Sequence, residues 1–347
     1  GSVRHPFRGH FDGGGNTISG LRIVNPARNL TNIGLFGVID GGSVRNLTIE
    51  AEDIVGEDNV AVLAGAILGD TVIYGVTVSG YVSAKGNAGG IAGEVTGSGR
   101  RAVIENCQAR GIVVNSEHPD SYTGGIAGNV QNAWLTDNLV TTQNGDANRI
   151  RGKGYVGGIA GRMNQTDIYN SYVSGTIGGN GSQAVGGIVG QYRSGNLILA
   201  RMAGTVAATN NGMASREGTF VGTRASRDRF TYGTEKQDNF SYLFARDAAR
   251  AKKVLGSTID GDNTFTKDAH IGYWTDQERK YVLVAGRTEF SGGERFFYEE
   301  LEDAVRYLIT QKLNREFTAT DYAKGTSFRL DHFAPGYMGE PVRGCLV

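Results

Sequence analysis

Cysteine, unbalanced charge and long apolar runs are all scarce in this sequence, and each shortage excludes a class of protein. The 347 residues include two cysteines, Cys107 and Cys345, which provide neither a disulfide framework nor a metal-binding set. The 35 basic and 35 acidic residues give zero net charge, so no general attraction to nucleic acid or to anionic membranes is expected. No apolar stretch approaches the ~20 residues that cross a bilayer, so no membrane insertion is expected.

Two motifs that would indicate metal chemistry are also missing. The five histidines are His5, His10, His118, His270 and His332, and none begins the His-Glu-x-x-His motif of zinc peptidases. Asp260-Gly261-Asp262-Asn263 begins like a calcium loop, but Phe265 and Ile271 stand where an EF-hand needs Gly and Glu. We therefore expect a solvated turn at Asp260, with no catalytic residues, no cofactor and no metal in this chain.

Glycine is abundant, in contrast to proline: there are 54 glycines and five prolines, and the glycines are periodic. The stretch Gly157-Gly158-Ile159-Ala160-Gly161 recurs at residues 89–93, 124–128 and 186–190, and looser copies end at Gly37, Gly65 and Gly222. Successive copies end 28 to 35 residues apart, as subtraction along the series 37, 65, 93, 128, 161, 190, 222 shows. A repeat of this length indicates a solenoid, a propeller or another array.

Each repeat has a second half, of which Ile104-Glu105-Asn106-Cys107 and Ile168-Tyr169-Asn170-Ser171 are examples. Every period contains three short strand patterns separated by small polar residues, and none shows the spacing of a helix. This predicts a mainly β protein, a right-handed parallel β-helix of about six to seven coils. A propeller is the alternative, but its blades need four strands over about 40 to 50 residues.

Coils stacked about 4.8 Å apart would align equivalent positions of successive repeats. An inward aliphatic ladder is expected from Ile91, Ile126, Ile159 and Ile188. An amide ladder at a turn is expected from Asn46, Asn106, Asn138 and Asn170, because stacked amides satisfy backbone groups that a bend leaves unpaired. Asp12 is expected to be a turn residue, and Cys107 a buried thiol.

The two half-repeats resemble the GLUG repeat of bacterial surface and secreted proteins. The resemblance covers about residues 7–206, and Phe7–Leu21 resembles the segment that usually precedes such repeats. Several carriers are large Gram-positive surface proteins, among them zinc metallopeptidases of the immunoglobulin-A1-protease type. The resemblance implies an extracellular or cell-surface location in bacteria. It carries no catalytic residues, because the repeats of that family lie outside the peptidase domain.

The composition changes near Asn210–Glu217, since 40 of the 54 glycines precede residue 211. We therefore expect the parallel β-helix over residues 1–212 and a small α+β domain or cap over residues 213–347. Within the second part, strands are predicted at Arg229–Tyr232 and Tyr281–Val284. Helices are predicted over residues 243–255 and Glu294–Leu313, the latter after a capping box.

Three functions are compatible with this sequence. The first is a non-catalytic extracellular segment of a larger chain, acting as a stalk, a spacer or a surface that binds a host protein or glycan. Gly1-Ser2 is typical of the remnant of an expression tag, which also suggests a segment of a larger chain. The second is an accessory substrate-binding region of an immunoglobulin-A1-protease-like zinc metallopeptidase whose active site lies elsewhere. The third is a carbohydrate-active β-helix enzyme using Asp137 and Asp167, which are otherwise expected to be exposed turn acids.

A specific binding site is expected where the chain departs from the repeat. The departures are residues 112–123, the insert Gln143–Lys153 and the C-terminal region. The basic residues of the longer repeats are Arg100, Arg101, Arg149, Arg151 and Lys153. Acidic residues lie in the same stretches, so a mixed solvated surface is expected there.

Overall fold

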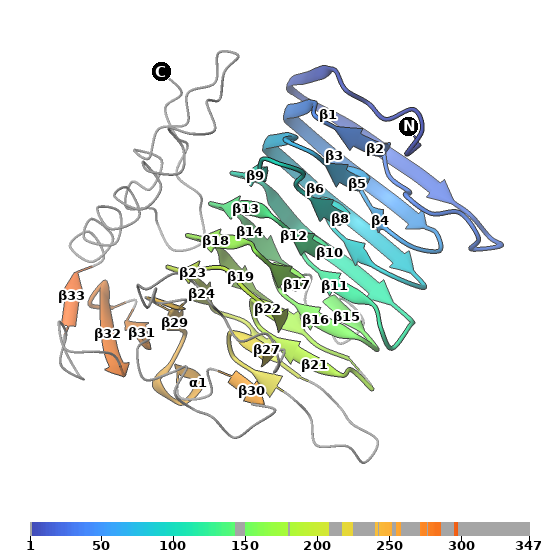
Figure 1. The fold of residues 1–347 in the computed structure, drawn as a ribbon. Coiled ribbons are helices and arrows are strands. Elements are labelled where there is room, and N and C mark those ends of the chain that lie inside the picture. The colour runs from blue at the N-terminus through green and yellow to red at the C-terminus, as the bar shows by residue number, and fades with distance from the viewer. Residues whose placement is uncertain are drawn as a thin grey trace.

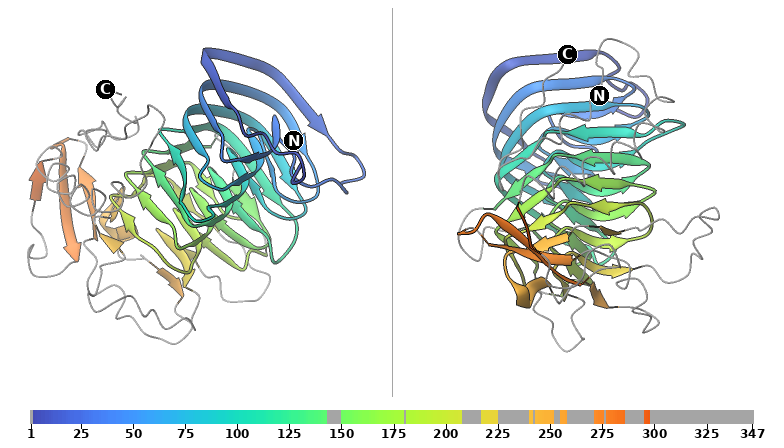
Figure 2. Two further views of the ribbon diagram at one scale, coloured as in Figure 1. Left: turned by 45° about the horizontal axis from the view of Figure 1, so that its top comes forward. Right: turned by 90° about the vertical axis from the view of Figure 1, so that its left-hand side faces the viewer.

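The chain folds into a parallel β-solenoid of about seven coils, with one short helix among the described residues, which confirms the predicted fold class (Figure 1). The computed structural model describes residues 2–142, 150–179, 181–207, 217–224, 240–241, 243–251, 255–257, 271–275, 277–285 and 295–297. Figure 2 shows the coils stacked along one axis, from the N-terminal coil to the strands β31–β33 at the other end. Within those ranges no helix is both long and apolar enough to cross a membrane.

Two of the three sheets contain one strand from each of several successive coils. The eight-stranded sheet comprises β2 (Phe36–Asp40), β5 (Ala64–Leu68), β8 (Ala92–Thr96), β12 (Ala127–Gln131), β17 (Ala160–Asn164), β22 (Val189–Tyr192), β27 (Val221–Arg224) and β30 (Leu255–Ser257). The six-stranded sheet comprises β4 (Val60–Ala61), β7 (Ala88–Gly89), β11 (Tyr122–Gly124), β16 (Tyr155–Gly157), β21 (Ala184–Gly186) and β26 (Glu217–Gly218).

The third sheet has 19 strands. Its first strands are long: β1 (His10–Val24), β3 (Ser43–Val55), β6 (Val72–Ala84) and β10 (Gln108–Ser116). Later coils divide the same path into β9 (Ala102–Glu105), β13 (Ala133–Thr136), β14 (Leu139–Thr141), β15 (Ile150–Gly152), β18 (Asp167–Tyr169), β19 (Tyr172–Ser174) and β20 (Thr176–Ile177). The last members are β23 (Leu197–Ile198), β24 (Arg201–Met202), β25 (Thr205–Val206), β28 (Phe240–Ser241), β29 (Leu243–Ala245), β31 (Ile271–Thr275), β32 (Lys280–Ala285) and β33 (Arg295–Phe297).

The recurring glycine motif forms the corner between two of these sheets. Gly157 ends β16 and Ala160 begins β17, so Ile159 lies at the turn, where its side chain is fully buried. Its amide donates to the carbonyl of Ile188 in the next coil, 2.9 Å away. The predicted ladder is confirmed, because Ile91, Ile126, Ile159 and Ile188 are all 0% exposed. Each such side chain contributes about 1.5–3 kcal/mol through burial.

The predicted amide ladder is wrong in one member. Residue pairing aligns Thr136 with both Glu105 and Tyr169, so Asp137 stands between Asn106 and Asn170. All three have left-handed backbones, with φ of 50° for Asn106, 55° for Asp137 and 43° for Asn170. Short polar side chains tolerate this conformation, which explains why Asp serves as well as Asn.

Asn138 lies one position further along and makes a different connection between coils. Its side-chain oxygen accepts from the Cys107 amide at 3.1 Å, and its Nδ2 donates to the Ile104 carbonyl at 3.0 Å. A side-chain amide therefore does bond to the backbone of the neighbouring coil, as expected. The amide that does so, Asn138, is stacked on Cys107, whereas Asp137 is stacked on Asn106.

Parallel pairing continues past residue 212, where the sequence predicts a domain boundary. β27 pairs with β22, β29 pairs with β24, and β31 pairs with β29, all in parallel. β32 and β33 then add antiparallel strands, and β32 confirms the strand predicted at Tyr281–Val284. The division into domains at residue 212 stays a prediction, as does the strand at Arg229–Tyr232, which lies outside the described residues.

The two predicted helices need correction where the structure describes them. Residues 243–245 form β29, which is fully buried against β24, and of the described residues between β29 and β30, Ala248–Ala251 (α1) are helical. Pairing with the preceding coil has overridden the local pattern, as tertiary contacts often do. Residues 295–297 form β33 instead of the first turn of a helix. The rest of that predicted helix lies outside the described residues.

Candidate functional site

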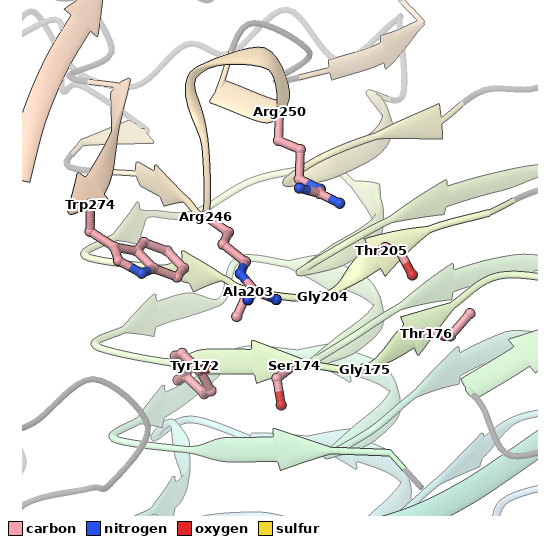
Figure 3. A pocket seen from close by; sticks show the side chains of 10 residues that line it. All are labelled: Tyr172, Ser174, Gly175, Thr176, Ala203, Gly204, Thr205, Arg246, Arg250 and Trp274. Atoms are coloured by element: carbon pink, nitrogen blue, oxygen red, sulfur yellow. The ribbon is translucent and has the colours of Figure 1, made fainter. Parts of the chain in front are cut away.

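An open groove of about 510 Å³ lies near the C-terminal end of the large sheet (Figure 3). We call it the arginine–tryptophan groove. It is formed by Tyr172, Ser174, Gly175, Thr176, Ala203, Gly204, Thr205, Arg246, Arg250 and Trp274. These residues come from β19, β20, β24–β25 with the turn between them, the β29–α1 segment and β31. The groove therefore combines the last regular repeats with the C-terminal region, one of the three predicted locations.

Strand alternation explains why Arg246 points into the groove. Val173, Met202 and Ala245 pair in register, and all three are fully buried in the core. Successive side chains of a strand point to opposite faces, so the next residues along each chain face outward. These residues are Ser174, Ala203, Arg246 and, in β31, Trp274, although other parts of the protein cover Trp274 to 6% exposure. The two small side chains leave room for the long Arg246 side chain to lie beside them.

Arg246 is the exposed cation of the groove. Its backbone amide donates to the Met202 carbonyl at 3.1 Å, which fixes its position on the coil. Within the described part of the chain, its guanidinium has neither a hydrogen bond nor an ion pair. Figure 3 shows its side chain between Trp274 and the backbone at Gly204. A guanidinium held in this way can bind an anionic group without first losing a protein partner.

Arg250 is already partly neutralised by Asp247. Asp247 caps α1, because its Oδ1 accepts from the Arg250 amide at 2.8 Å, and its Oδ2 forms an ion pair with the Arg250 guanidinium. The backbone hydrogen bond from Arg250, followed by its charge, lowers the pKa of Asp247 below its usual range. The Arg250 carbonyl also accepts from Thr219 Oγ1 at 2.8 Å, which ties this turn to the neighbouring coil.

A second hollow of about 450 Å³ lies beside the groove and differs from it in charge. The two share Gly204, Thr205 and Arg250, but the second is also lined by Glu217 and Asp247. None of the described residues that line the arginine–tryptophan groove is acidic. The charge of the groove therefore favours an anion, whereas the neighbouring hollow carries charges of both signs.

Asp167, one of the two carboxylates considered for catalysis, connects four successive coils. It is 1% exposed and forms an ion pair with Arg101. It also accepts from Trp134 Nε1 at 3.2 Å and from the backbone and side-chain nitrogens of Asn196 at 2.8 and 2.9 Å. Arg101 additionally covers the Trp134 ring, 5.0 Å from its centre. The expectation of an exposed turn acid is wrong for Asp167.

Asp137, the other candidate carboxylate, is buried in a different column of the stack. It is 3% exposed and accepts a hydrogen bond from Asn170 Nδ2. Asp167 pairs in register with Trp134, three residues before Asp137, so the two carboxylates do not face each other across adjacent coils. The structure therefore does not bring them together as the acid–base pair of a glycosidase, and Asp137 is not an exposed turn acid either.

Glu105 is a buried acid that sequence reasoning did not single out. It is 4% exposed, and burial, followed by repulsion from Asp137, raises its pKa well above the usual range. Glu105 pairs in register with Thr136 of the next coil, so it lies close to Asp137, which follows Thr136. The stacked coils on either side bury it. No motif in the sequence marks it, because burial depends on the stacked neighbours.

Two smaller predictions are confirmed by local geometry. Asp12 Oδ1 accepts from the Gly14 amide at 2.9 Å, as expected of a turn residue. Cys107 is fully buried, and this burial raises the pKa of its thiol to about 12. Its thiol donates to the Glu105 carbonyl at 3.2 Å, so Cys107 is a packing residue and not a nucleophile.

The remaining candidate residues do not assemble into a site in the described structure. Arg101 is bound to Asp167, and Arg151 Nε donates to Asn115 at 3.0 Å, so they belong to separate contacts. Arg149 and the Asp260–Asn263 turn lie outside the described residues. In the described ranges, no group of three His, Cys, Asp or Glu side chains is placed to hold a metal ion.

Comparison with known proteins gives two distant matches. Halomucin of Haloquadratum walsbyi is 37% identical over 95 residues, which are 27% of this chain and 1% of that protein. The zinc metalloprotease ZmpC of Streptococcus pneumoniae is 29% identical over 245 residues, which are 66% of this chain and 12% of that protein. The chain thus spans only a small part of either relative. No family model matches it, so the GLUG assignment stays a prediction, and no solved structure matches.

Proposed function

We propose that this chain is a non-catalytic β-helical segment of a bacterial surface or secreted protein, serving as a rigid spacer that also presents a binding surface. The observation that supports this most is the continuity of the core, from Ile39 in β2 to Ile271 in β31. Coils that share one core and parallel ladders resist bending, as repeat proteins do when each unit packs on its neighbours. The arginine–tryptophan groove supplies the binding surface.

The location of the buried acids supports a role without catalysis. Asp137 and Asp167, the carboxylates that a β-helix enzyme would offer, are buried and bonded to neighbouring coils. The groove itself contains cations, hydroxyls and aromatic rings but no carboxylate among its described residues. Such a set can orient a ligand, and it lacks a base that could activate water.

A second candidate function rests on the similarity to the zinc metalloprotease ZmpC. In this proposal the solenoid is an accessory region that holds substrate for a peptidase domain elsewhere in a larger protein. The two proposals differ kinetically. Deleting an accessory region from the full-length protein raises KM for a protein substrate and leaves cleavage of a short peptide unchanged, whereas deleting a spacer changes neither.

The test of the non-catalytic proposal is an activity assay on the purified chain. We expect no hydrolysis of casein or of polygalacturonate above the protein-free blank, either with added zinc or with a chelator. The control is the Asp167→Asn variant, which would lose any activity that depended on this carboxylate. Turnover of either substrate by the unmodified chain would overturn the proposal.

A further inference from the structure

We infer that the arginine–tryptophan groove binds a sugar ring that carries a carboxylate, as part of an acidic oligosaccharide. This inference rests on the proposed function, in which the solenoid presents a binding surface. It goes beyond that proposal because it assigns the ligand chemistry to particular side chains.

The charge of the groove favours an anion. Arg246 is exposed and its guanidinium is unpaired among the described residues, while Arg250 adds a cation whose charge Asp247 partly offsets. The planar guanidinium presents two parallel N–H groups that match the two oxygens of a carboxylate.

The surroundings of Arg246 favour a carbohydrate over a simple anion. Figure 3 places the rings of Trp274 and Tyr172 on one side of Arg246 and the hydroxyl of Thr205 on the other. Trp274 is 6% exposed, so the half-buried ring of Tyr172 supplies most of the accessible aromatic surface, whose apolar face and polar edge suit the C–H face and polar rim of a sugar. Thr176 and Thr205 pair in register, so their hydroxyls lie one coil apart and can both reach a ring in the groove.

The size of the groove suits a short oligosaccharide. Its volume of about 510 Å³ lies within the range of roughly 300–1,000 Å³ typical of small-ligand sites. Its open side leaves room for a longer chain to enter and leave. The neighbouring hollow contains Glu217 and Asp247 beside Arg250, so it offers an anion less positive charge than the groove does. The charged ring is therefore assigned to the side of Arg250 that faces Arg246.

The test compares carboxylated sugars with neutral counterparts of the same shape. The probes are trigalacturonate with its methyl ester, and sialyllactose with its methyl ester, titrated into the whole chain by calorimetry or NMR. We expect at least one carboxylated sugar to bind about tenfold or more tightly than its neutral counterpart, with affinity falling as salt is raised. Which of the two acidic sugars binds distinguishes a uronate from a sialic acid as the source of the carboxylate.

Single substitutions test whether the acidic sugar binds in the arginine–tryptophan groove. Arg246→Gln should weaken binding of the acidic sugar at least about tenfold. Arg22→Gln, an arginine whose side chain is 59% exposed near the opposite end of the solenoid, should leave binding unchanged. Asp247→Asn keeps a capping side chain on α1 but removes the charge that offsets Arg250, so it should strengthen binding a few-fold. Far-UV circular dichroism confirms that each variant is folded.

Three results would overturn the inference: equal affinity for charged and neutral sugars, an Arg246→Gln affinity equal to that of the unmodified chain, or binding of none of the probes. Each of these leaves the spacer proposal standing, because that proposal depends on rigidity and on the absence of hydrolysis. Conversely, hydrolysis of polygalacturonate would overturn the non-catalytic proposal even if Arg246 proved to be the binding residue.

Discussion

Gly157→Ala should lower the free energy of unfolding by about 3 kcal/mol, the upper end of what overpacking costs. A Cβ at this position would lie 2.0 Å from the Ala160 carbonyl oxygen and 2.7 Å from the Gly190 amide nitrogen of the next coil. Both contacts are with backbone, so a rotamer change cannot relieve them and the corner itself must shift. The measurement is urea unfolding followed by far-UV circular dichroism.

The matched control for this glycine is Gly9→Ala. The nearest atoms to a Cβ at Gly9 belong to the end of the Phe7 ring, 3.2 Å away, and that ring can move. We expect Gly9→Ala to change stability by less than about 0.5 kcal/mol. If Gly157→Ala were as stable as Gly9→Ala, the corner would not have the close approach that the motif is proposed to serve.

Asp167→Ala should destabilise the protein by about 3 kcal/mol, as expected when one partner of a buried ion pair is removed. The substitution leaves Arg101 without its carboxylate, and it leaves the indole N–H of Trp134 and the amide of Asn196 without their acceptor. Because Trp134 loses its hydrogen bond, its fluorescence should change together with the unfolding midpoint. Both are measured in one denaturant titration.

Asp120→Ala is the control, since the Asp120 side chain is 81% exposed and lies 3.9 Å from His118. Exposed pairs of this kind contribute about 0–1 kcal/mol. Asp167→Asn keeps one acceptor oxygen and should therefore lose less stability than Asp167→Ala. A stability of Asp167→Ala equal to that of Asp120→Ala would contradict the role assigned to this buried carboxylate.

The sequence predicts features that recur at a constant spacing, because equivalent residues stack. Ile159 and its counterparts were predicted to be buried from position alone, and all are buried. The predicted asparagine ladder is wrong at Asn138, because the repeats were aligned by residue type. Aligning Leu135 with Ile104 and Ile168, the buried strand residues, places Asp137 and not Asn138 in the ladder. Burial pattern is thus a better guide to register than amide chemistry.

The sequence predicts the location of the groove only as the C-terminal region and not by residue. Several residues of the groove lie beyond the last regular repeat, where the sequence no longer shows which residues stack. Val173 and its partner Met202 are 29 residues apart, within the repeat spacing, whereas Met202 and its partner Ala245 are 43 residues apart. No local signal shows that residue 245 continues the same column, so Arg246 could not be placed beside Ser174. The charged, aromatic composition after residue 211 was the only available indication.

The most direct test of the stacked-coil account is the distance between spin labels on one column of the solenoid. Thr17 and Tyr172 are five register steps apart, and Thr48 and Tyr172 are four. At about 4.8 Å for each coil, the backbone separations should be about 24 and 19 Å. Labels would be attached after Cys345→Ser, while the buried Cys107, whose pKa is raised to about 12, should remain unlabelled.

Pulsed electron–electron double resonance between the two spin labels measures both separations. The account predicts two narrow distributions whose centres differ by about one coil, about 5 Å, with the longer distance for the Thr17–Tyr172 pair. Broad distributions would contradict a rigid spacer. Separations that do not increase with the number of coils would contradict the parallel stack itself, and with it the corner glycines, the buried ladders and the arginine–tryptophan groove.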